Sequence, residues 1–437
     1  MARRWFQVFR LLTGLALFAT LLGGCESATP HPGNNIATPG VIKIGAELPL
    51  AGDDASAGKA AEDGIRLAID EANRQHILPG YTLILDAKND VGASGVQDPS
   101  VGAVNVMELI SDAQVAGIVG PLASNVARAE MPLTNQKGMG QISPASTASC
   151  LTQNTLESGC TGPDNLIPLL RPTGRVTYFR LATPDNLQGA LTADFAYRTL
   201  GYRRVVVIDD TEADGASLTS NFINQFTSDG GRVVSHMYLQ GRSDYAAELQ
   251  KIAILRPDAI YFTGQSTNSG SVLRRQMEAT PGLEATPLLI GDALIANAIA
   301  QAGGAASAGP VYSIVASADA TANPSATEFV QKYQSMYGPI GPYSASSYDC
   351  AWILIDAVKA AISAGAKPPT AADDSDAASS FRQAVISALM KTDYDGVTGH
   401  QSFDPDGDTM NRVISVYQIT DTDGRSGWKY IGSESSS

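Results

Sequence analysis

The sequence predicts an α/β protein of two lobes, each built around a parallel sheet. Short apolar runs alternate with amphipathic helical segments along most of the chain, which is typical of repeated β-α units. The chain has 437 residues, too many for a single core, so we expect it to divide into two domains. Its composition, 44% hydrophobic and 17% charged, is that of a globular protein.

The N-terminus has the features of an export signal. A positively charged start precedes an uncharged apolar run from Leu11 to Leu22. This pattern is typical of a secretory signal, and the run is too short for a comfortable membrane span. Leu22-Gly23-Gly24-Cys25 resembles a bacterial lipobox, which implies a signal peptide over residues 1–24, lipidation of Cys25 and an extracytoplasmic, membrane-anchored protein. Paired arginines near the start leave general secretory and twin-arginine export both open.

The segment after the signal differs in composition from the rest of the chain. Residues 25–40 are rich in Ser, Thr, Pro, Gly and Asn and contain almost no large apolar side chain. Such a segment cannot bury enough surface to fold, so we interpret it as a flexible tether. The formal net charge of -14 repels phosphate backbones, which argues against a nucleic-acid partner.

The first lobe is predicted from two blocks of β-α units. A strand at Val41–Ala46 and a helix at Ala60–Asn73 begin the first block. The second block, Val115–Thr147, follows the order strand, turn, helix, strand, turn. In a parallel sheet both turns lie at the carboxyl ends of their strands, so we expect Ser124 and the run Ser143 to Thr147 to face one crevice.

Another set of β-α units predicts the second lobe. Its strands are expected at Arg204–Ile208, Val233–Tyr238, Ala259–Phe262 and Leu288–Ile290, with helices between them. Later helices belong to the first lobe again, and a terminal strand at Val413–Ile419 to the second. The expected division is residues 41–180 and 315–400 in the first lobe, and residues 181–314 and 401–437 in the second. Three crossings between lobes predict a hinge.

Two cysteines close together suggest a covalent link. Cys150 and Cys160 flank a short loop rich in polar residues. In an exported protein this arrangement predicts a disulfide, and two free thiols in an inserted loop are the alternative.

The sequence lacks the patterns of catalytic and metal sites. None of its four histidines stands in a hydrolase or metalloprotease motif, and no cysteine-histidine spacing indicates a metal site. The run Asp404 to Asp408 begins like a calcium loop, but Ser415 occupies the twelfth position, where a glutamate is expected. We interpret that run as a hairpin turn. The prediction is a protein without enzymatic activity, cofactor or metal.

Several marks together resemble a known family. They are Ile42-Lys43-Ile44-Gly45, the pair Gly52 and Gly58, the run Asp86 to Asp90, the Val115–Thr147 block, and the run Phe403 to Asp408. In order and spacing these marks resemble the leucine-binding type of periplasmic binding protein, which serves branched-chain amino acid and amide ABC transporters. The resemblance implies the type I periplasmic binding protein fold, with two Rossmann-like lobes joined by a three-strand hinge, and an ABC permease as partner.

The resemblance also implies binding residues. In the family, a serine after the third strand and the following Ser-Pro loop receive the ligand's carboxylate and ammonium; the matching positions here are Ser124, Ala145, Ser146 and Thr147. Hydroxyls and free amides can hold such charges without a fixed charge of their own.

On the second lobe the matching positions are more polar than in the family. Asp214 and Gln265 stand where the family has aromatic residues, and Ala57 replaces a further aromatic in the first lobe. Asp292 matches the acid that pairs with the ammonium, and Tyr343 matches an aromatic that lines the pocket. A pocket poor in aromatics suits a small polar ligand, such as a polar amino acid or amide, better than leucine.

These expectations define one function and two alternatives. We expect a lipid-anchored, extracytoplasmic solute-binding protein that closes on a small polar ligand and delivers it to an ABC permease. A ligand sensor for a membrane receptor has the same requirements, and a lipid-anchored enzyme is the third reading.

Overall fold

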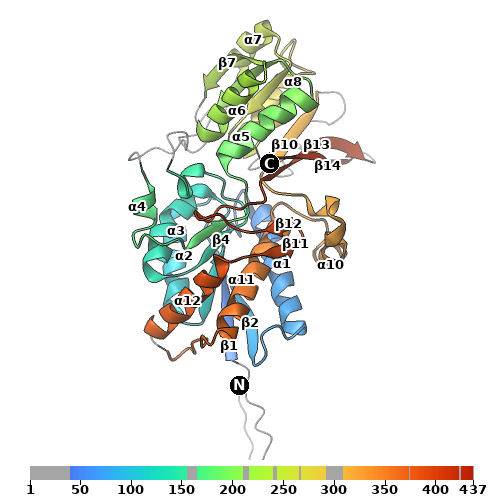
Figure 1. Ribbon diagram of the computed structural model, residues 1–437. Coiled ribbons are helices and arrows are strands. Elements are labelled where there is room, and N and C mark those ends of the chain that lie inside the picture. The colour runs from blue at the N-terminus through green and yellow to red at the C-terminus, as the bar shows by residue number, and fades with distance from the viewer. Residues whose placement is uncertain are drawn as a thin grey trace, which may run out of the picture. The chain divides into compact units, whose positions relative to one another are not determined.

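The computed structural model describes residues 40–154, 165–209, 216–239, 244–264, 267–291, 309–373, 375–422 and 425–436. Two sheets organise these residues (Figure 1). The first has five strands in the order β2-β1-β3-β4-β5, all parallel. The second has seven, in the order β14-β13-β10-β9-β8-β6-β7, and only β13 runs opposite to the others, antiparallel to both β10 and β14. The prediction of two α/β lobes with mostly parallel sheets is confirmed.

The first sheet and its helices form the first lobe. The strands are β1 (Gly40–Leu48), β2 (Tyr81–Asn89), β3 (Val115–Val119), β4 (Gln141–Ser143) and β5 (Tyr178–Arg180). The helices are α1 (Ala55–Arg74), α2 (Pro99–Ser111), α3 (Ser124–Lys137), α4 (Ile167–Leu170), α10 (Thr327–Tyr337), α11 (Ser344–Ser363) and α12 (Ser375–Leu389). A short hairpin of β11 (Tyr394–Gly396) and β12 (Gly399–Gln401) follows α12.

Successive side chains of β1 point alternately to the two faces of the first sheet, and different helices cover each face. Ile42 and Ile44 are buried in one core with residues of α1 and α11. On the other face a Cβ on Gly45 would contact Leu109 of α2, and Glu47 accepts a hydrogen bond from Asn105 of α2. Because successive side chains point to opposite faces, Glu47 is directed under α2 and α3 rather than toward α1.

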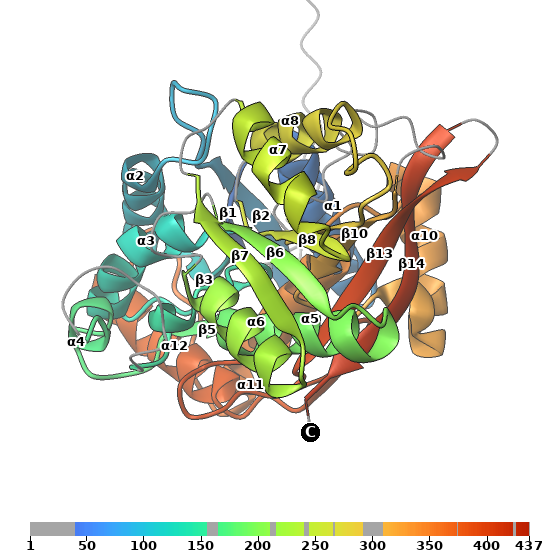
Figure 2. The ribbon, with the colours of Figure 1, turned by 90° about the horizontal axis from the view of Figure 1, so that it is seen from above.

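The second sheet is covered by helices on both faces. Its strands are β6 (Arg204–Asp209), β7 (Arg232–Tyr238), β8 (Ala259–Phe262), β9 (Leu288–Ile290), β10 (Val311–Val315), β13 (Val413–Thr422) and β14 (Arg425–Ser435). Helices α5 (Asp185–Asp194) and α6 (Ala216–Ser228) bury one face, and α7 (Ala246–Leu255) and α8 (Thr267–Glu278) the other (Figure 2). This second lobe thus has two cores separated by its sheet.

The three segments that join the sheets meet at one residue. Thr183 follows β5, and its backbone N–H donates to the carbonyl of Ala316, just after β10, at 2.8 Å. Its Oγ1 donates to the carbonyl of Val413, at the start of β13, at 2.7 Å. Thr183 is fully buried, so these two bonds fix the crossings to one another.

The predicted elements lie within a few residues of their observed positions. β8 and β9 have the predicted bounds, whereas several elements, among them the helices α2, α5 and α12, were not predicted. In α2 the apolar residues do not form one stripe, because Val104 and Met107 are exposed while Val106 is buried, so the periodic signal of a surface helix is weak. No helix among the described residues has the length and apolar character needed to cross a membrane.

Candidate functional site

The turn after β3 brings the first candidate loop to the carboxyl edge of the first sheet. Gly120 has φ of 119°, and a Cβ there would lie 2.1 Å from the carbonyl oxygen of Glu47. Only glycine fits such a position. The chain then passes Pro121 and begins α3 at Ser124.

The Ser143 hydroxyl organises the second loop. Its Oγ donates to the carbonyl of Pro121 at 2.7 Å and accepts from the backbone N–H of Ser146 at 2.9 Å. The Ser146 hydroxyl in turn lies 3.2 Å from the carbonyls of both Pro121 and Leu122. Ser146 is 1% exposed, and its hydroxyl helps to hold the two loops together.

Ser124 and Thr147 are the more accessible members of the predicted set. Ser124 Oγ accepts from the backbone N–H of Ala148 at 3.1 Å, which joins the two loops directly and leaves the hydroxyl proton free to donate. Thr147 is only partly buried, and its carbonyl accepts from the backbone N–H of Asp185 at 2.9 Å. Ala145 is buried. The structure therefore brings the two predicted hydroxyl loops together, and Ser124 and Thr147 are their partly exposed hydroxyls.

Tyr343 belongs to another element of the same lobe. It immediately precedes α11 with φ of 61°, and its carbonyl accepts from the N–H of Ser347 at 2.8 Å. Its side chain packs, partly buried, against the core of the first lobe. Its role in a pocket stays a prediction.

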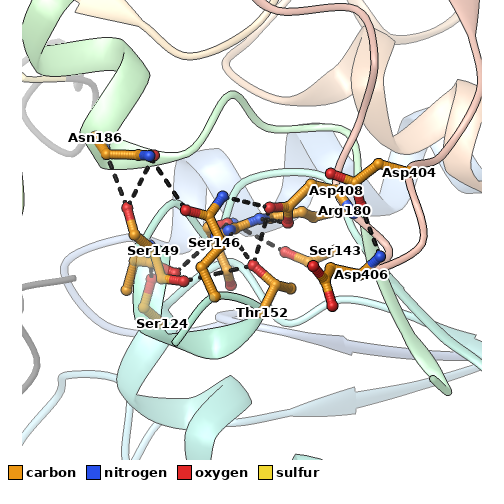
Figure 3. Close-up of polar contacts among 12 residues, drawn as sticks. Ser124, Ser143, Ser146, Ser149, Thr152, Arg180, Asn186, Asp404, Asp406 and Asp408 are labelled. Atoms are coloured by element: carbon orange, nitrogen blue, oxygen red, sulfur yellow. Dashed lines mark hydrogen bonds and ion pairs between the residues drawn. The ribbon is translucent and has the colours of Figure 1, made fainter. Parts of the chain in front are cut away.

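A buried ion pair lies beside the second loop (Figure 3). Arg180, at the end of β5, donates from Nε to Asp408 Oδ1 at 2.7 Å, and the two side chains are 0% and 2% exposed. Thr152 and Gln153 donate to Asp408 Oδ2 at 3.0 and 2.8 Å. Burial alone would raise the pKa of Asp408, but the Arg180 charge and these hydrogen bonds outweigh it and hold the pKa below its ordinary value.

On the α2 and α3 side of the sheet, three carboxyl groups are buried with no ion pair to a cation among the described residues. Glu47, Asp90 and Glu130 are each 0% exposed. The side chain of Asn105 donates to Glu47, and that of Gln141 donates to Glu130. Burial, with the charges of Glu130 and Asp90, raises the pKa of Glu47 to about 10. Burial also raises the pKa of Asp90 to about 7 and that of Glu130 well above its usual range. Burial therefore favours the protonated forms of Glu47 and Glu130 at neutral pH.

Most predicted residues of the second lobe and the leader cannot be placed. Asp214, Gln265 and Asp292, together with Cys25 and Cys160, lie outside the described residues. Cys150 is buried and disulfide-bonded, which agrees with the predicted bridge, although the pairing with Cys160 stays a prediction.

The acidic run near the C-terminus forms a tight turn. The Asp404 side chain accepts from the backbone N–H groups of Asp406 and Asp408 at 2.9 and 3.0 Å, and Gly407 N–H donates to the Asp404 carbonyl. These bonds explain the run as a turn, as the sequence predicts. Within the part of the chain that the structure describes, no group of three His, Cys, Asp or Glu side chains is arranged to hold a metal ion.

Comparison with known proteins identifies the fold as a binding-protein fold. A family model described as "Periplasmic binding protein" matches residues 41–425. The chain belongs to this family. A Leu/Ile/Val-binding protein of Rhizobium johnstonii, BraC3, is 24% identical over 379 residues, which cover 86% of this chain and 91% of that protein.

Solved structures agree with this assignment. The leucine-binding protein LivK of Thermotoga maritima is 26% identical, with a TM-score of 0.68 over 89% of this chain and 97% of that one. A solute-binding protein of R. palustris in complex with benzoate is 19% identical, with a TM-score of 0.66 over 89% and 95%. As members of one binding-protein family, these relatives support a general role in solute binding for this extracytoplasmic family and give no support to an enzyme.

Sequence reasoning missed the Arg180–Asp408 pair and the carboxyl cluster. The only sequence signal is that Arg180 directly follows two aromatic residues in a mostly apolar segment. An arginine buried in such a segment requires a polar or charged partner. Its partner is 228 positions away, and no local pattern indicates which of the many aspartates it is.

Proposed function

We propose that this protein captures a small polar ligand, such as a polar amino acid or amide, between its two lobes and delivers it to an ABC permease. The observation that carries this proposal is the hydrogen bond from Ala148 N–H to Ser124 Oγ. It joins two loops at the carboxyl edge of a parallel sheet, where α/β proteins bind ligands. The partly exposed hydroxyls of Ser124 and Thr147 can then share one ligand carboxylate.

The ligand class follows from the residues that replace the family's aromatics. Ala57 lies in the first turn of α1, where it packs partly buried against the first-lobe core, and it offers no ring surface to a leucine side chain. Asp214, Gln265 and Asp292 add polar groups by the family resemblance. A polar side chain on the ligand is therefore favoured over an aliphatic one.

A thermal-shift screen tests the function directly. A ligand that binds only the folded state raises the melting temperature, so the full chain is screened against the common L-amino acids, their amides and small aromatic acids. We expect the largest shift with a polar amino acid or amide. A shift confined to leucine, isoleucine and valine, or to benzoate, would contradict the proposed ligand class.

Substitutions locate the site. Ser124→Ala and Thr147→Ala each remove one hydrogen bond to a charged ligand group and are expected to weaken binding by about 1.5–3 kcal/mol in calorimetric titration. Ser111→Ala is the matched control, because its hydroxyl only contacts the carbonyl of Glu108 near the end of α2. Unchanged affinity in both test variants would place the site elsewhere.

Membrane attachment is a separate part of the proposal. Cys25 in the lipobox-like segment supports a lipid anchor, and detergent partition of cells carrying Cys25→Ser tests it. We expect the variant to leave the detergent phase. Partition equal to that of the unmodified sequence would exclude lipidation at Cys25.

A further inference from the structure

The loop that carries Thr147, residues 145–153, is held by a buried arginine from outside it. Arg180 Nη1 donates to the carbonyl of Ala148 at 2.7 Å and to that of Ser146 at 3.3 Å. These carbonyls lie on either side of Thr147. Because Arg180 is 0% exposed, its N–H groups need protein partners, and two of the partners of Nη1 are backbone carbonyls of this loop.

Asp408 fixes the other end of the same loop. Arg180 Nη2 donates to Thr152 Oγ1 at 2.6 Å, and the Thr152 hydroxyl donates a hydrogen bond to Asp408 Oδ2 at 3.0 Å. Gln153 Nε2 also donates to Asp408 Oδ2. Asp408 precedes β13 in the third crossing, and Arg180 opens the first. The loop is thus attached to two of the three crossings through side chains.

The loop is also bonded to the second lobe at the first turn of α5. Asn186 Nδ2 donates to Gln153 Oε1 at 3.1 Å, and the Asn186 backbone N–H donates to Ser149 Oγ at 3.0 Å. Asp185 N–H donates to the Thr147 carbonyl. Figure 3 shows Asn186, Ser149 and Arg180 within this one network. Thr147 therefore lies between a side-chain network of the hinge and a helix of the other lobe.

We propose that Arg180 is a positioning residue that couples the hinge to the ligand loop. When the lobes rotate about the crossings, the Arg180–Asp408 pair keeps residues 145–153 and the start of α5 moving together, so Thr147 keeps its place relative to the second lobe. This inference rests on the proposed function for the identity of what the loop binds. A ligand shifts the closure of two lobes only through its different affinity for the two states, and Arg180 contributes to that difference without touching the ligand.

A conservative substitution with a matched control tests this role. Arg180→Lys keeps the charge, but one ammonium group cannot reproduce the planar set of bonds to Asp408, Thr152 and two carbonyls. Arg382→Lys is the control. Arg382 is 3% exposed and donates to the carbonyls of Val115, Ile110 and Asp112 at 2.9, 3.1 and 2.6 Å, beside the amino end of β3. Both variants break a buried arginine network that holds carbonyls, but only one network lies at the hinge.

Hydrogen–deuterium exchange of the ligand-free full chain gives the first readout. In Arg180→Lys we expect amides of residues 145–153 and of the first turn of α5 to exchange about tenfold faster than in the unmodified chain. Arg382→Lys is expected to change only amides near its own carbonyl partners. Equal exchange in Arg180→Lys and the unmodified chain, or equal changes in both variants, would overturn the coupling.

A second variant covers the case in which Arg180→Lys does not fold. Gln153→Ala leaves the ion pair intact and removes only the bond to Asn186 and one bond to Asp408. We expect the backbone amides in the first turn of α5 to exchange faster, while the exchange rates of the amides in β5 stay unchanged. An unchanged exchange rate in the first turn of α5 would overturn the coupling.

Titration gives the second readout, with L-glutamine and L-leucine as probes. We expect Arg180→Lys to weaken the binding of the better probe about tenfold, which is about 1.4 kcal/mol, and Arg382→Lys to stay within about twofold. Equal affinities in the two variants would overturn the role of Arg180. If neither probe binds the unmodified chain, L-glutamine and L-leucine are excluded as ligands, and the exchange experiment, which uses no ligand, still decides the coupling.

Discussion

Two buried polar clusters, one at the hinge and one in the first lobe, differ in the presence of a cation. At the hinge, Asp408 is paired with Arg180 and accepts two further hydrogen bonds. Under α2 and α3, the described neighbours of Glu47, Asp90 and Glu130 include amides and one another but no paired cation. Burial penalises charge in both places. The first cluster keeps its charges because they compensate each other, whereas in the second cluster burial favours the protonated forms of Glu47 and Glu130.

The difference predicts opposite responses to pH. The pKa of Asp408 is lowered in the folded state, so its contribution to stability is present above the unfolded value near 3.8 and is lost as the pH falls through the folded value. The pKa values of Glu47 and Asp90 are raised, so their contribution is complete at acidic pH and is lost as the pH rises. Stability should therefore have a maximum on the acidic side of neutrality.

The largest expected effect comes from removing the anion of the compensated cluster. Asp408→Ala leaves the Arg180 guanidinium buried without its partner, which typically costs about 3–5 kcal/mol of unfolding free energy. Asp406→Ala, two residues earlier in the same turn, is the matched control. The Asp406 side chain is exposed, and its Oδ1 lies 3.3 Å from Arg171 Nη1. Removal of this side chain should therefore lower the unfolding free energy by less than about 1 kcal/mol. Urea denaturation measures both, and equal losses would contradict the comparison.

A smaller and pH-dependent effect is expected in the uncompensated cluster. Glu47→Gln keeps an acceptor for Asn105 and replaces the carboxyl proton by an amide proton, so the variant imitates the protonated acid. Between about pH 5 and 8 the unmodified chain releases the Glu47 proton only when it unfolds, and a glutamine has no such proton to release. The loss of stability with rising pH should therefore become shallower by about 1.4 kcal/mol per pH unit. We expect the variant to match the unmodified chain at pH 5 and to exceed it at pH 8. Parallel profiles would show that Glu47 is already ionised in the folded chain.

Local sequence patterns predicted the parts of the site that depend on neighbouring residues. Strand, turn and helix alternation placed Ser124 and the Ser143–Thr147 loop at one edge of the sheet, because the carboxyl ends of parallel strands must meet there. The hydrogen bond from Ala148 to Ser124 confirms that meeting. The family resemblance, not the pattern, implies Ser146 as a binding residue, and the structure places its hydroxyl 3.2 Å from the carbonyls of Pro121 and Leu122. A pattern identifies the loop but not the direction of each hydroxyl.

The clusters themselves could not be predicted, because each depends on residues far apart in sequence. Glu47 stands within a strand that is otherwise mostly apolar, and alternation alone directs it away from Ile44 and Ala46. No local sequence pattern indicates that the side chain of Glu130, on α3, lies near that of Glu47. The fold of the family is readable from order and spacing, while pairings such as Arg180 with Asp408 require the folded chain.

The smallest expected effect comes from a substitution that removes hydrogen bonds from the hinge cluster but leaves its two charges in place. Thr152→Val keeps the shape of the side chain and removes the hydroxyl between Arg180 Nη2 and Asp408 Oδ2. Hydrogen bonds to charged groups contribute about 1.5–3 kcal/mol, but the added methyl group is buried and recovers up to about 0.8 kcal/mol, and the charges remain paired through Nε. We therefore expect a loss of about 1–2 kcal/mol in urea denaturation at pH 7, clearly less than for Asp408→Ala. A loss as large as that of Asp408→Ala would mean that the hydroxyl bridge, rather than compensation of charge, keeps this cluster ionised.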